Sequence, residues 1–497
     1  MNRLLNSVLG RMTMYRTVTV VLIVLVLDAF ALAYAGNLDP STFKPVSMFL
    51  TLATLTVASL GSDAVLGLVF GVRVHLESAL ITALLLWFIY WPTGVISELA
   101  WLALIAVVAQ ASKFVIAVHQ RHVVNPAAAG IVLSMLGVWA FPDSGLPLPM
   151  WWVANSAMIW VVVAGALAVL WRTGRLGLGL VFVLLSGTWT VRSLQGVGTP
   201  FGESLAFAWN SAPIVFFAGF MLSEPLTLPP RRWQKYVVAV VAAVVFTWPL
   251  TTYYLTGAPR TFGPFEGTQE LALVATGLIA LACRQRAVSL RLLSRRSLGG
   301  EYVEYTFAPE RSLVVEPGQF VEIHVPHRAD SRGQRRMFSV VSPPGEVVQI
   351  ALREPQPGSS FKAALAQADR MRVTSVHGDF TWPRDASIPL LLVAGGIGIT
   401  PFLSQLRSEA AAGRDVVVVH AVHRLDEAPY AAELAACDAV VHTIEADVLD
   451  PQMVIDRVPD LASRIAYISG DPAMVDALAP ILRRRAKGIK TDAFLGY

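Results

Sequence analysis

Three closely spaced glycines after a hydrophobic run form the pattern in this sequence with the clearest chemical meaning. Residues 391–394 read as a buried strand, and the helix beyond the turn opens with Thr400 as N-cap and Pro401 as its first residue. The turn between strand and helix carries Gly395, Gly396 and Gly398. Glycines let backbone approach a ligand, and a helix N-terminus favours an anion such as a dinucleotide pyrophosphate. The spacing therefore predicts a nucleotide-binding turn.

A second strand–turn–helix pattern follows later in the chain. Residues 465–469 read as a strand, Gly470 makes the turn, and a helix runs through Arg485 with Asp471 as its cap and Pro472 as its first residue. The strands expected in this region alternate with helical stretches and lie near 389–394, 415–421, 438–443 and 465–469. This alternation predicts a parallel sheet.

Shorter strands precede this region. Alternating apolar residues recur near 301–308, 319–325, 336–341, 347–353 and 371–376, with proline, glycine and charged turns between them. They predict a small antiparallel β-barrel at 298–385, followed by the α/β domain at 386–497. A basic segment, 286–297, is expected to link these domains to a membrane domain at 1–285, and it suits an anionic inner leaflet.

The first half of the chain has the composition of a lipid-embedded protein. Residues 1–283 hold 14 Lys/Arg and 10 Asp/Glu, whereas residues 284–497 hold 25 of each. The net charge of +4 therefore belongs to the first half and indicates membrane topology rather than nucleic-acid binding. Cys283 and Cys437 are the only cysteines, which excludes a four-cysteine iron–sulfur cluster or a structural zinc site within this chain, so no metal site is expected.

Apolar runs predict about ten membrane spans. They lie near 17–36, 46–70, 76–91, 98–118, 127–141, 150–171, 176–190, 209–223, 236–254 and 268–283. Eleven basic residues fall in the N-terminal segment and alternate loops, against three in the opposite loops. The positive-inside rule then predicts a multi-pass protein of the cell membrane with both termini in the cytoplasm.

Two polar segments interrupt these spans. Asn125 precedes Pro126 at the start of the fifth span, and Glu224 precedes Pro225 at the end of the eighth. Helices broken by proline near membrane depth commonly line ligand sites, because their freed backbone groups need partners inside the protein. Ordinary helix ends at the membrane interface are the alternative that spacing alone leaves open.

These segments carry a family resemblance. The Asn125-Pro-Ala motif, the Ser223-Glu-Pro-Leu-Thr motif and the span count resemble the Rnf D/Nqr B membrane family, over about residues 15–285. Its members are membrane components of Rnf electron-transport complexes and of the related sodium-pumping NADH:quinone oxidoreductase. The resemblance implies a flavin held within the membrane by the Asn125 and Glu224 segments, and an FMN esterified to an outer threonine. Thr199 matches that threonine best, but the residues before it depart from the usual attachment sequence, so a non-covalent flavin stays open.

Two segments of the C-terminal half, Arg336-Met-Phe-Ser339 and Gly358-Ser-Ser-Phe361, lie in the expected barrel ahead of the parallel sheet. In these segments and in the order of the two domains, the chain resembles the ferredoxin–NADP reductase superfamily over about residues 298–497. The resemblance implies bound FAD, with Arg336 on the pyrophosphate, Phe338 packed on the flavin and Ser339 near flavin N5. A planar guanidinium suits a pair of pyrophosphate oxygens. Further flavin-phosphate contacts are expected from Gly358, Ser359 and Ser360.

The same resemblance implies a site for NAD(P)H and an aromatic shield for the flavin. The dinucleotide segment comprises Gly395, Gly396, Gly398, Thr400 and Pro401. The turn near the nicotinamide comprises Ser469, Gly470 and Asp471, where Ser469 replaces the cysteine of the family and Asp471 a proline. Phe494 or Tyr497 would shield the flavin. Ser339 and Thr400 are the expected catalytic residues.

The fold class expected is thus a multi-pass α-helical membrane domain of about ten helices, fused to an antiparallel β-barrel FAD domain and an α/β parallel-sheet nucleotide-binding domain. The expected function is a membrane-bound NAD(P)H-dependent flavin oxidoreductase that passes electrons through FAD and a membrane flavin to a quinone or an extracytoplasmic flavoprotein. Arg424 would suit a 2′-phosphate and Asp426 a ribose diol, so NADH and NADPH are both open.

Two other functions are alternatives for the membrane half. A haem domain, as in ferric reductases and NADPH oxidases, needs histidines on facing helices, whereas the membrane half offers His75, His119 and His122, and the last two share one segment. A transporter whose soluble domain senses nucleotide would leave the flavin and nicotinamide motifs without purpose. Coupling of electron flow to Na⁺ or H⁺, and the oligomeric state, stay open.

Overall fold

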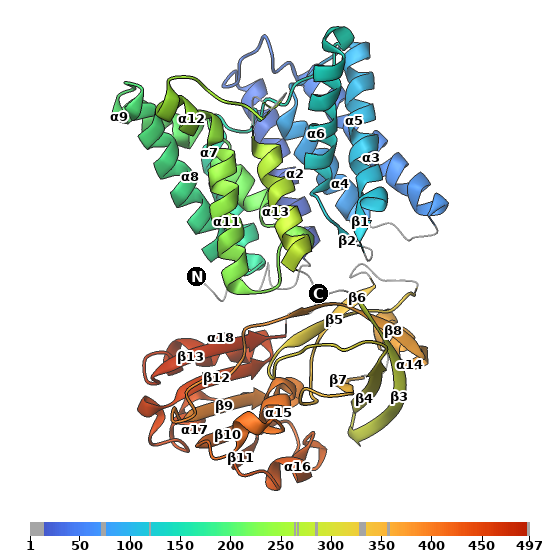
Figure 1. Cartoon of the computed structure of the whole chain (residues 1–497), viewed down its shortest axis with the longest axis vertical. Helices are drawn as coiled ribbons and strands as arrows, with labels where there is room; N and C mark the ends of the chain where they lie inside the picture. The colour runs from blue at the N-terminus through green and yellow to red at the C-terminus, as the bar shows by residue number, and fades with distance from the viewer. Residues whose placement is uncertain are drawn as a thin grey trace. The chain divides into compact units, whose positions relative to one another are not determined.

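The chain divides into two compact units, which we describe separately. The computed structural model describes residues 14–70, 76–118, 121–262, 265, 268–283, 287–327, 334–354 and 358–494. The helical unit comprises Met1–Arg284 and the C-terminal unit Gln285–Tyr497 (Figure 1). The division falls where the charged residues become frequent in the sequence.

The helical unit consists mainly of apolar helices. Their bounds are α2 (Met14–Tyr34), α3 (Pro45–Val69), α4 (Leu76–Ile89), α5 (Ile96–Val115), α6 (Pro126–Ala140), α7 (Ile159–Arg172), α8 (Leu176–Gly196), α9 (Phe201–Asn210), α10 (Ile214–Phe216), α11 (Arg232–Phe246), α12 (Trp248–Thr256) and α13 (Gln269–Cys283). A π-helical turn, Phe217–Met221, continues α10, and a short hairpin joins β1 (Ala117–Val118) to β2 (Arg121–His122). Helix α3 packs on α4 and α5, α5 on α6, and α11 on α8 and α13 (Figure 1).

Only some of these helices are long enough to cross a membrane. Among the described residues, four helices have the length and composition of a span, namely α2, α3, α5 and α8, and the number rises to six if two bent helix pairs each count as one span. The expectation of about ten spans is therefore not confirmed. Helices α4 and α7 have 14 residues each, and α6 and α13 have 15. At about 1.5 Å per residue they reach about 21–23 Å, short of a hydrocarbon core of about 30 Å.

The C-terminal unit contains a six-stranded antiparallel sheet. Its strands are β3 (Val288–Gly299), β4 (Tyr302–Pro309), β5 (Phe320–His324), β6 (Arg335–Ser339), β7 (Val348–Arg353) and β8 (Arg370–His377), in the order β6-β5-β8-β3-β4-β7. A single antiparallel bridge, Val340 to Ile350, links the chain after edge strand β6 to edge strand β7. Helix α14 (Ser360–Gln367) connects β7 to β8.

Strand β3 corrects the expectation of a basic linker at 286–297. It pairs with β4 and with β8, so it lies inside the sheet. Val288 and Leu290 are buried in the hydrophobic core, whereas Arg291 and Arg295 face outward. The exposure of the strand alternates only over residues 288–293, and residues 293–297 are all exposed, so the sequence of its second half resembles a basic linker.

The parallel sheet expected from the sequence is confirmed. Strands β9 (Leu390–Gly395), β10 (Val416–Val422), β11 (Val440–Glu445), β12 (Ile465–Gly470) and β13 (Gly488–Ala493) lie in the order β11-β10-β9-β12-β13, and every pair is parallel. The central strand β9 buries Leu391 and Val393 in one core and Leu390 and Leu392 in another, as a strand covered on both faces does.

Short helical elements connect these strands. They are a 3₁₀ turn (Gly396–Ile399) leading into α15 (Thr400–Leu406), then α16 (Ala431–Ala435), α17 (Pro451–Ile455) and α18 (Pro472–Leu482). Helix α18 ends three residues before Arg485, the end expected from the sequence. Strand β13 was missed, because the expectation treated the last residues only as an aromatic tail.

Candidate functional site

The glycine turn after β9 has the backbone shape that its sequence predicts. Gly396 has φ of 51°, in the left-handed region that favours glycine. A Cβ added at Gly398 would lie 2.4 Å from the carbonyl oxygen of Ser469 and 2.8 Å from Cα of Gly470. Gly398 is therefore needed for close packing of this turn against the turn after β12. The expectation of close approach to a ligand stays a prediction for these glycines.

Thr400 does not cap the helix as expected. Ile399 occupies the N-cap position, and Thr400 already has helical dihedral angles. Its hydroxyl donates to the carbonyl of Ile397 at 3.0 Å instead of accepting a backbone N–H. The physical reason is that the 3₁₀ turn runs directly into α15, which leaves no extended residue between turn and helix. Pro401 lies in the first turn of the helix, as expected.

The second turn follows β12 and lies beside the first. Asp471 is the N-cap of α18 and accepts from the backbone N–H of Ala473 at 2.8 Å, with Pro472 next, which confirms the expected cap. Gly470 has φ of 148°. Ser469 is fully buried, and its hydroxyl has no hydrogen-bond partner among the described residues. A buried hydroxyl without a partner marks a place where a polar group of a ligand would be stabilised.

A buried histidine that sequence reasoning missed supports the first turn. His420 on β10 lies beside Ala394 on β9, which in turn lies beside Ser469 on β12. Its Nε2–H donates to the carbonyl of Gly396 at 2.9 Å, and burial lowers its pKa, so the ring is neutral. The signal in the sequence was a lone histidine after a run of four valines, 416–419.

The two flavin segments expected from the sequence come together. Arg336 and Phe338 lie on β6, and both side chains contact Phe361 at the start of α14: the guanidinium lies 5.1 Å from its ring centre and the Phe338 ring 5.9 Å. Ser339 ends β6 and is buried. Phe361 is the last residue of the segment 358–361 matched to the flavin-phosphate site, but no role was predicted for its side chain.

Residues 358–360 form the start of helix α14. Ser359 is its N-cap and accepts from the backbone N–H of Lys362 at 3.3 Å. The hydroxyl of Ser360 lies 3.4 Å from Nε2 of His327, whose ring also packs on Phe361. A serine-capped helix start next to an arginine and two aromatic rings offers both an anion site and a flat apolar surface.

The end of the chain returns to the second turn. The backbone N–H of Phe494 donates to the carbonyl of Gly470 at 2.9 Å, so this predicted aromatic residue lies close to the Ser469–Asp471 turn. Tyr497 lies outside the described residues, and its predicted role stays a prediction.

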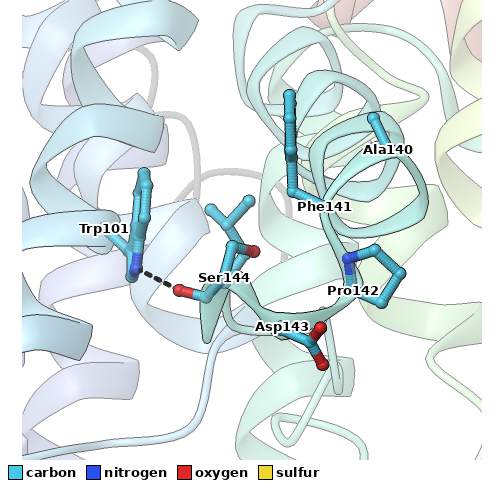
Figure 2. Close-up of a pocket in the computed structure, with 7 residues that line it drawn as sticks. Trp101, Ala140, Phe141, Pro142, Asp143 and Ser144 are labelled. Atoms are coloured by element: carbon cyan, nitrogen blue, oxygen red, sulfur yellow. Dashed lines mark hydrogen bonds between the residues drawn. The ribbon is translucent and has the colours of Figure 1, made fainter.

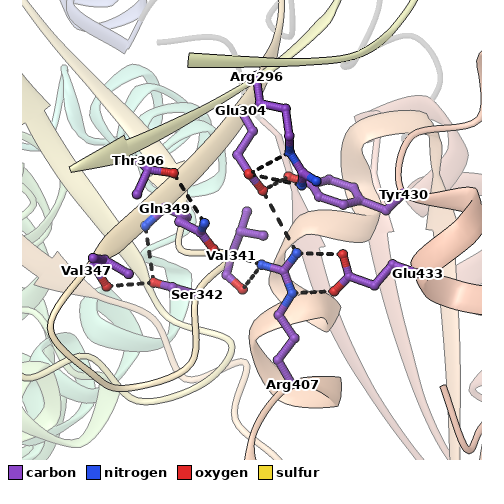
Figure 3. A network of polar contacts seen from close by, with 10 residues as sticks. All are labelled: Arg296, Glu304, Thr306, Val341, Ser342, Val347, Gln349, Arg407, Tyr430 and Glu433. Carbon is purple, nitrogen blue, oxygen red and sulfur yellow. Dashed lines mark hydrogen bonds and ion pairs between the residues drawn. The ribbon is translucent and has the colours of Figure 1, made fainter. Parts of the chain in front are cut away.

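A network of polar side chains joins the two sheets of the C-terminal unit (Figure 3). Arg407, at the end of α15, donates to the carbonyl of Val341 at 3.1 Å and to Oε1 of Gln349 at 3.0 Å, and it forms a two-point ion pair with Glu433. Its Nη2 also lies 3.9 Å from the buried carboxylate of Glu304 on β4. The helix that begins at the glycine turn is thereby attached to the antiparallel sheet.

Two further residues complete this network. Tyr430, which has φ of 61°, donates its hydroxyl proton to Glu304 at 2.7 Å. Arg296 donates to the other oxygen of Glu304 at 3.1 Å and lies over the Tyr430 ring. The carboxylate of Glu304 is thus satisfied from both sheets, as a buried charge must be.

In the helical unit, the two interrupted segments meet. Nδ2 of Asn125 donates to Oε2 of Glu224 at 2.8 Å, and Nε2 of His122 lies 2.5 Å from Oε1 of the same carboxylate. Asn125 also caps α6 by accepting from the N–H of Ala128 at 3.3 Å. The segments are therefore adjacent, and their flavin contacts stay a prediction. Nε2 of His122 is engaged by Glu224, and His75 and His119 lie outside the described residues, so the haem alternative is not tested.

Thr199 lies in a turn after α8. Its backbone N–H donates to the carbonyl of Leu194 at 3.0 Å, Gly198 before it has φ of 95°, and its side chain is part-exposed. Covalent FMN at this hydroxyl stays a prediction.

Two hollows in the helical unit lie away from the predicted residues. One, of about 670 Å³, lies beside a 3₁₀ turn (Pro142–Ser144), where Trp101 Nε1 donates to the carbonyl of Ser144 at 3.0 Å (Figure 2). The other, of about 290 Å³, is lined by aromatic residues that include Trp91 and Trp152. Neither is lined by Asn125, Glu224 or Thr199.

Comparison with known proteins places the similarity in the C-terminal half. No family model matches the chain. The reductase component of propane 2-monooxygenase from Rhodococcus jostii is 26% identical over 230 residues, which are 41% of this chain and 57% of that protein. Flavohemoprotein A from Dictyostelium discoideum is 28% identical over 227 residues, 38% of this chain and 57% of that protein. The chain thus spans little more than half the length of these relatives, which are oxidoreductases.

Two solved reductase structures also align with part of this chain. The Amycolatopsis cytochrome P450 reductase GcoB is 22% identical, with a TM-score of 0.38, over 42% of this chain and 70% of that chain. The FAD/NAD-binding domain of a nitric oxide dioxygenase from Vibrio cholerae is 16% identical, with a TM-score of 0.36, over 41% of this chain and 98% of that domain. These TM-scores are low, so the fold of the C-terminal unit rests on the strand orders of its two sheets. The C-terminal half resembles such reductases, and the resemblance of the helical unit to the Rnf D/Nqr B membrane family stays a prediction.

Proposed function

We propose that this protein is a membrane-bound NAD(P)H-dependent flavin oxidoreductase. It oxidises NAD(P)H at the C-terminal unit, which holds FAD, and delivers electrons through a flavin in the helical unit to a quinone or an extracytoplasmic flavoprotein. The observation that carries the proposal is the geometry of the C-terminal unit. In this unit Arg336 packs on Phe361, and the turn at Gly398 packs against the turn at Gly470. Arg407 attaches one sheet to the other.

The residues of the C-terminal unit fit both cofactors. FAD accepts a hydride from a nicotinamide and releases its electrons singly, which is the chemistry that the cofactors supply. Arg336 and the start of α14 would hold the flavin pyrophosphate, and Phe338 and Phe361 supply apolar packing. The buried hydroxyl of Ser469, which has no partner in the described part of the chain, would orient the nicotinamide. His420 fixes the carbonyl of Gly396, so the first turn is held in shape before any ligand binds.

The helical unit would supply the path across the lipid. A hydrocarbon core of about 30 Å is too wide for one useful electron transfer step, so a redox carrier within the helices is required. The Asn125–Glu224–His122 cluster is the proposed place for that carrier, since polar groups inside membrane helices commonly mark functional sites. An FMN esterified to Thr199 is the proposed outer carrier. Lipid surrounds the unit, and both termini are proposed to be cytoplasmic.

The test is made on the full chain purified in detergent. We expect FAD in the extracted flavin, a visible spectrum without a Soret band, and bleaching of the flavin by anaerobic addition of NADH or NADPH. Arg336→Ala should lose FAD, with affinity reduced roughly tenfold or more, because a charged contact to the pyrophosphate is removed. Arg370→Ala is the control, since Arg370 is an exposed arginine of the same sheet that pairs with Glu310 at the surface.

Three results would refute the proposal. Purified protein that binds no isoalloxazine would remove its basis, and a Soret band would favour the haem alternative instead. Protease mapping in oriented vesicles that places the two termini on opposite sides would contradict the topology.

A further inference from the structure

A charged segment, residues 423–427, lies beside the first glycine turn. Ala421 near the end of β10 lies beside Gly395, and Val422 lies beside Glu445 at the end of β11. Residues 423–427 therefore leave the sheet at its carboxyl edge, directly next to the turn. In doubly wound sheets the residues beyond the second strand reach the adenosine ribose, where an acid binds the 2′-hydroxyl of NADH and an arginine accommodates the 2′-phosphate of NADPH.

The only arginine in this segment is already bound to a carboxylate. Nε of Arg424 donates to Oδ1 of Asp426 at 3.0 Å, and Nη2 donates to Oδ2 at 2.6 Å. Oε1 of Glu427 also lies near this guanidinium, 3.8 Å from Nε of Arg424. The planar guanidinium, which could bind a phosphate through two hydrogen bonds, is therefore already paired with a carboxylate of the same segment. The hydrogen bond from Arg424 lowers the pKa of Asp426 further below neutral pH, so its carboxylate is ionised there.

The neighbouring strand end adds negative charge. Glu445 accepts from the backbone N–H of Leu425 at 3.1 Å, and Asp447 lies 3.0 Å from Nδ1 of His423. Segments 423–427 and 445–447 together hold four carboxylates against one guanidinium, so their net charge is −3 with the histidine neutral. Both side chains of the Arg424–Asp426 pair are about two-thirds exposed, so an incoming ligand can reach them.

We propose that Asp426 makes the dinucleotide site selective for NADH over NADPH. The inference rests on the proposed function and deepens it. The ionised carboxylate accepts hydrogen bonds from the ribose diol of NADH. The 2′-phosphate of NADPH would have to displace Asp426 from Arg424 and then lie among like charges. The site itself is defined independently by the glycine turn, and the acidic segment sets only its choice between the two nucleotides.

The experiment measures anaerobic reduction of the bound flavin in the full chain by NADH and by NADPH. For wild type we expect kcat/KM to be at least tenfold higher with NADH. Asp426→Asn should lower kcat/KM for NADH roughly tenfold, equivalent to about 1.4 kcal/mol, and raise it for NADPH, because it removes the acceptor for the diol and releases Arg424. Asp447→Asn is the matched control. It removes the same charge but leaves the Arg424–Asp426 pair intact, so it should shift the NADH-to-NADPH ratio several-fold less than Asp426→Asn does.

Each other outcome overturns the inference. Wild type that prefers NADPH, or uses both equally, contradicts it while leaving the proposed function intact. Equal shifts in Asp426→Asn and Asp447→Asn would assign the preference to net charge rather than to Asp426. Loss of NADPH activity in Arg424→Ala, with NADH activity retained, would show that the arginine reads a 2′-phosphate. Failure of both nucleotides to reduce the flavin would remove the inference together with the proposed function.

Discussion

Replacing Arg407 by alanine should lower the free energy of unfolding of the C-terminal unit, because it removes contacts between the two sheets. Arg407 makes hydrogen bonds to the carbonyl of Val341 and to Gln349, and both acceptors lose their partner in the variant. Each such bond contributes about 1 kcal/mol to stability. The two-point pair with Glu433 adds about 1 kcal/mol, a modest figure because the Glu433 side chain is 38% exposed. The expected loss in free energy of unfolding is therefore about 3 kcal/mol.

Hydrogen exchange in the full chain measures this loss where it occurs. The amides of β9 and β10 report opening of the C-terminal unit alone, and a loss of about 3 kcal/mol should accelerate their exchange on the order of 100-fold. The control is Arg424→Ala, which also removes a two-point arginine–carboxylate pair, but one whose guanidinium is 63% exposed. That variant should change stability by no more than about 0.5 kcal/mol.

Arg407→Ala should also slow the reduction of the bound flavin. Arg407 follows the helix that begins at the glycine turn, so losing it lets the glycine turn shift relative to the antiparallel sheet. A misplacement of about 1 Å between reacting groups costs on the order of 100-fold in rate. If Arg407→Ala exchanges no faster than Arg424→Ala and reduces flavin at the wild-type rate, the network of Figure 3 does not hold the two sheets in register.

Other predictions test single features. Burial raises the pKa of Asp492 from 3.8 to about 6, so the protein loses stability as pH rises through that range. At about 1.4 kcal/mol per pKa unit, Asp492→Asn should be more stable than wild type by about 3 kcal/mol at about pH 8 and nearly equal to it at about pH 4 in thermal unfolding. Gly398→Ala would bring a methyl group against the Ser469 carbonyl and should cost about 1–3 kcal/mol and weaken nucleotide binding in titration, whereas Gly345→Ala, at an open position, should not. Thr199→Val should abolish the in-gel flavin fluorescence of denatured wild type; a band that survives in the variant would place any covalent flavin elsewhere.

The sequence predicted the parallel sheet well because both of its signals are local. A fully apolar strand such as β9 and the turn chemistry of Gly470, Asp471 and Pro472 depend on neighbouring residues only. Strand β3 was missed for the opposite reason. Its partners β4 and β8 are set by tertiary pairing, and the arginines on its exposed face resemble a linker when the chain is considered alone.

The site was predicted as segments but not as contacts. Arg336 and Phe338 were named from the resemblance to a flavin motif, but their contact with Phe361 was not predicted, because aromatic packing across 20 or more residues has no local signature. The role of His420 was missed for a similar reason, since its hydrogen-bond partner is the carbonyl of Gly396, 24 residues away. Thr400 was misplaced by one position because a 3₁₀ turn, rather than an extended residue, precedes its helix. Such boundaries are set by backbone hydrogen bonds that residue preferences do not resolve.

The contact between Gly398 and the carbonyl of Ser469 has a consequence for engineering. The loops after β9 and β12 behave as one piece, because neither can change its backbone path without colliding with the other. Grafting one of them from another reductase would therefore fail even where every ligand contact was preserved. A successful graft would have to transfer both loops together with His420, whose hydrogen bond to the carbonyl of Gly396 holds the first loop in place.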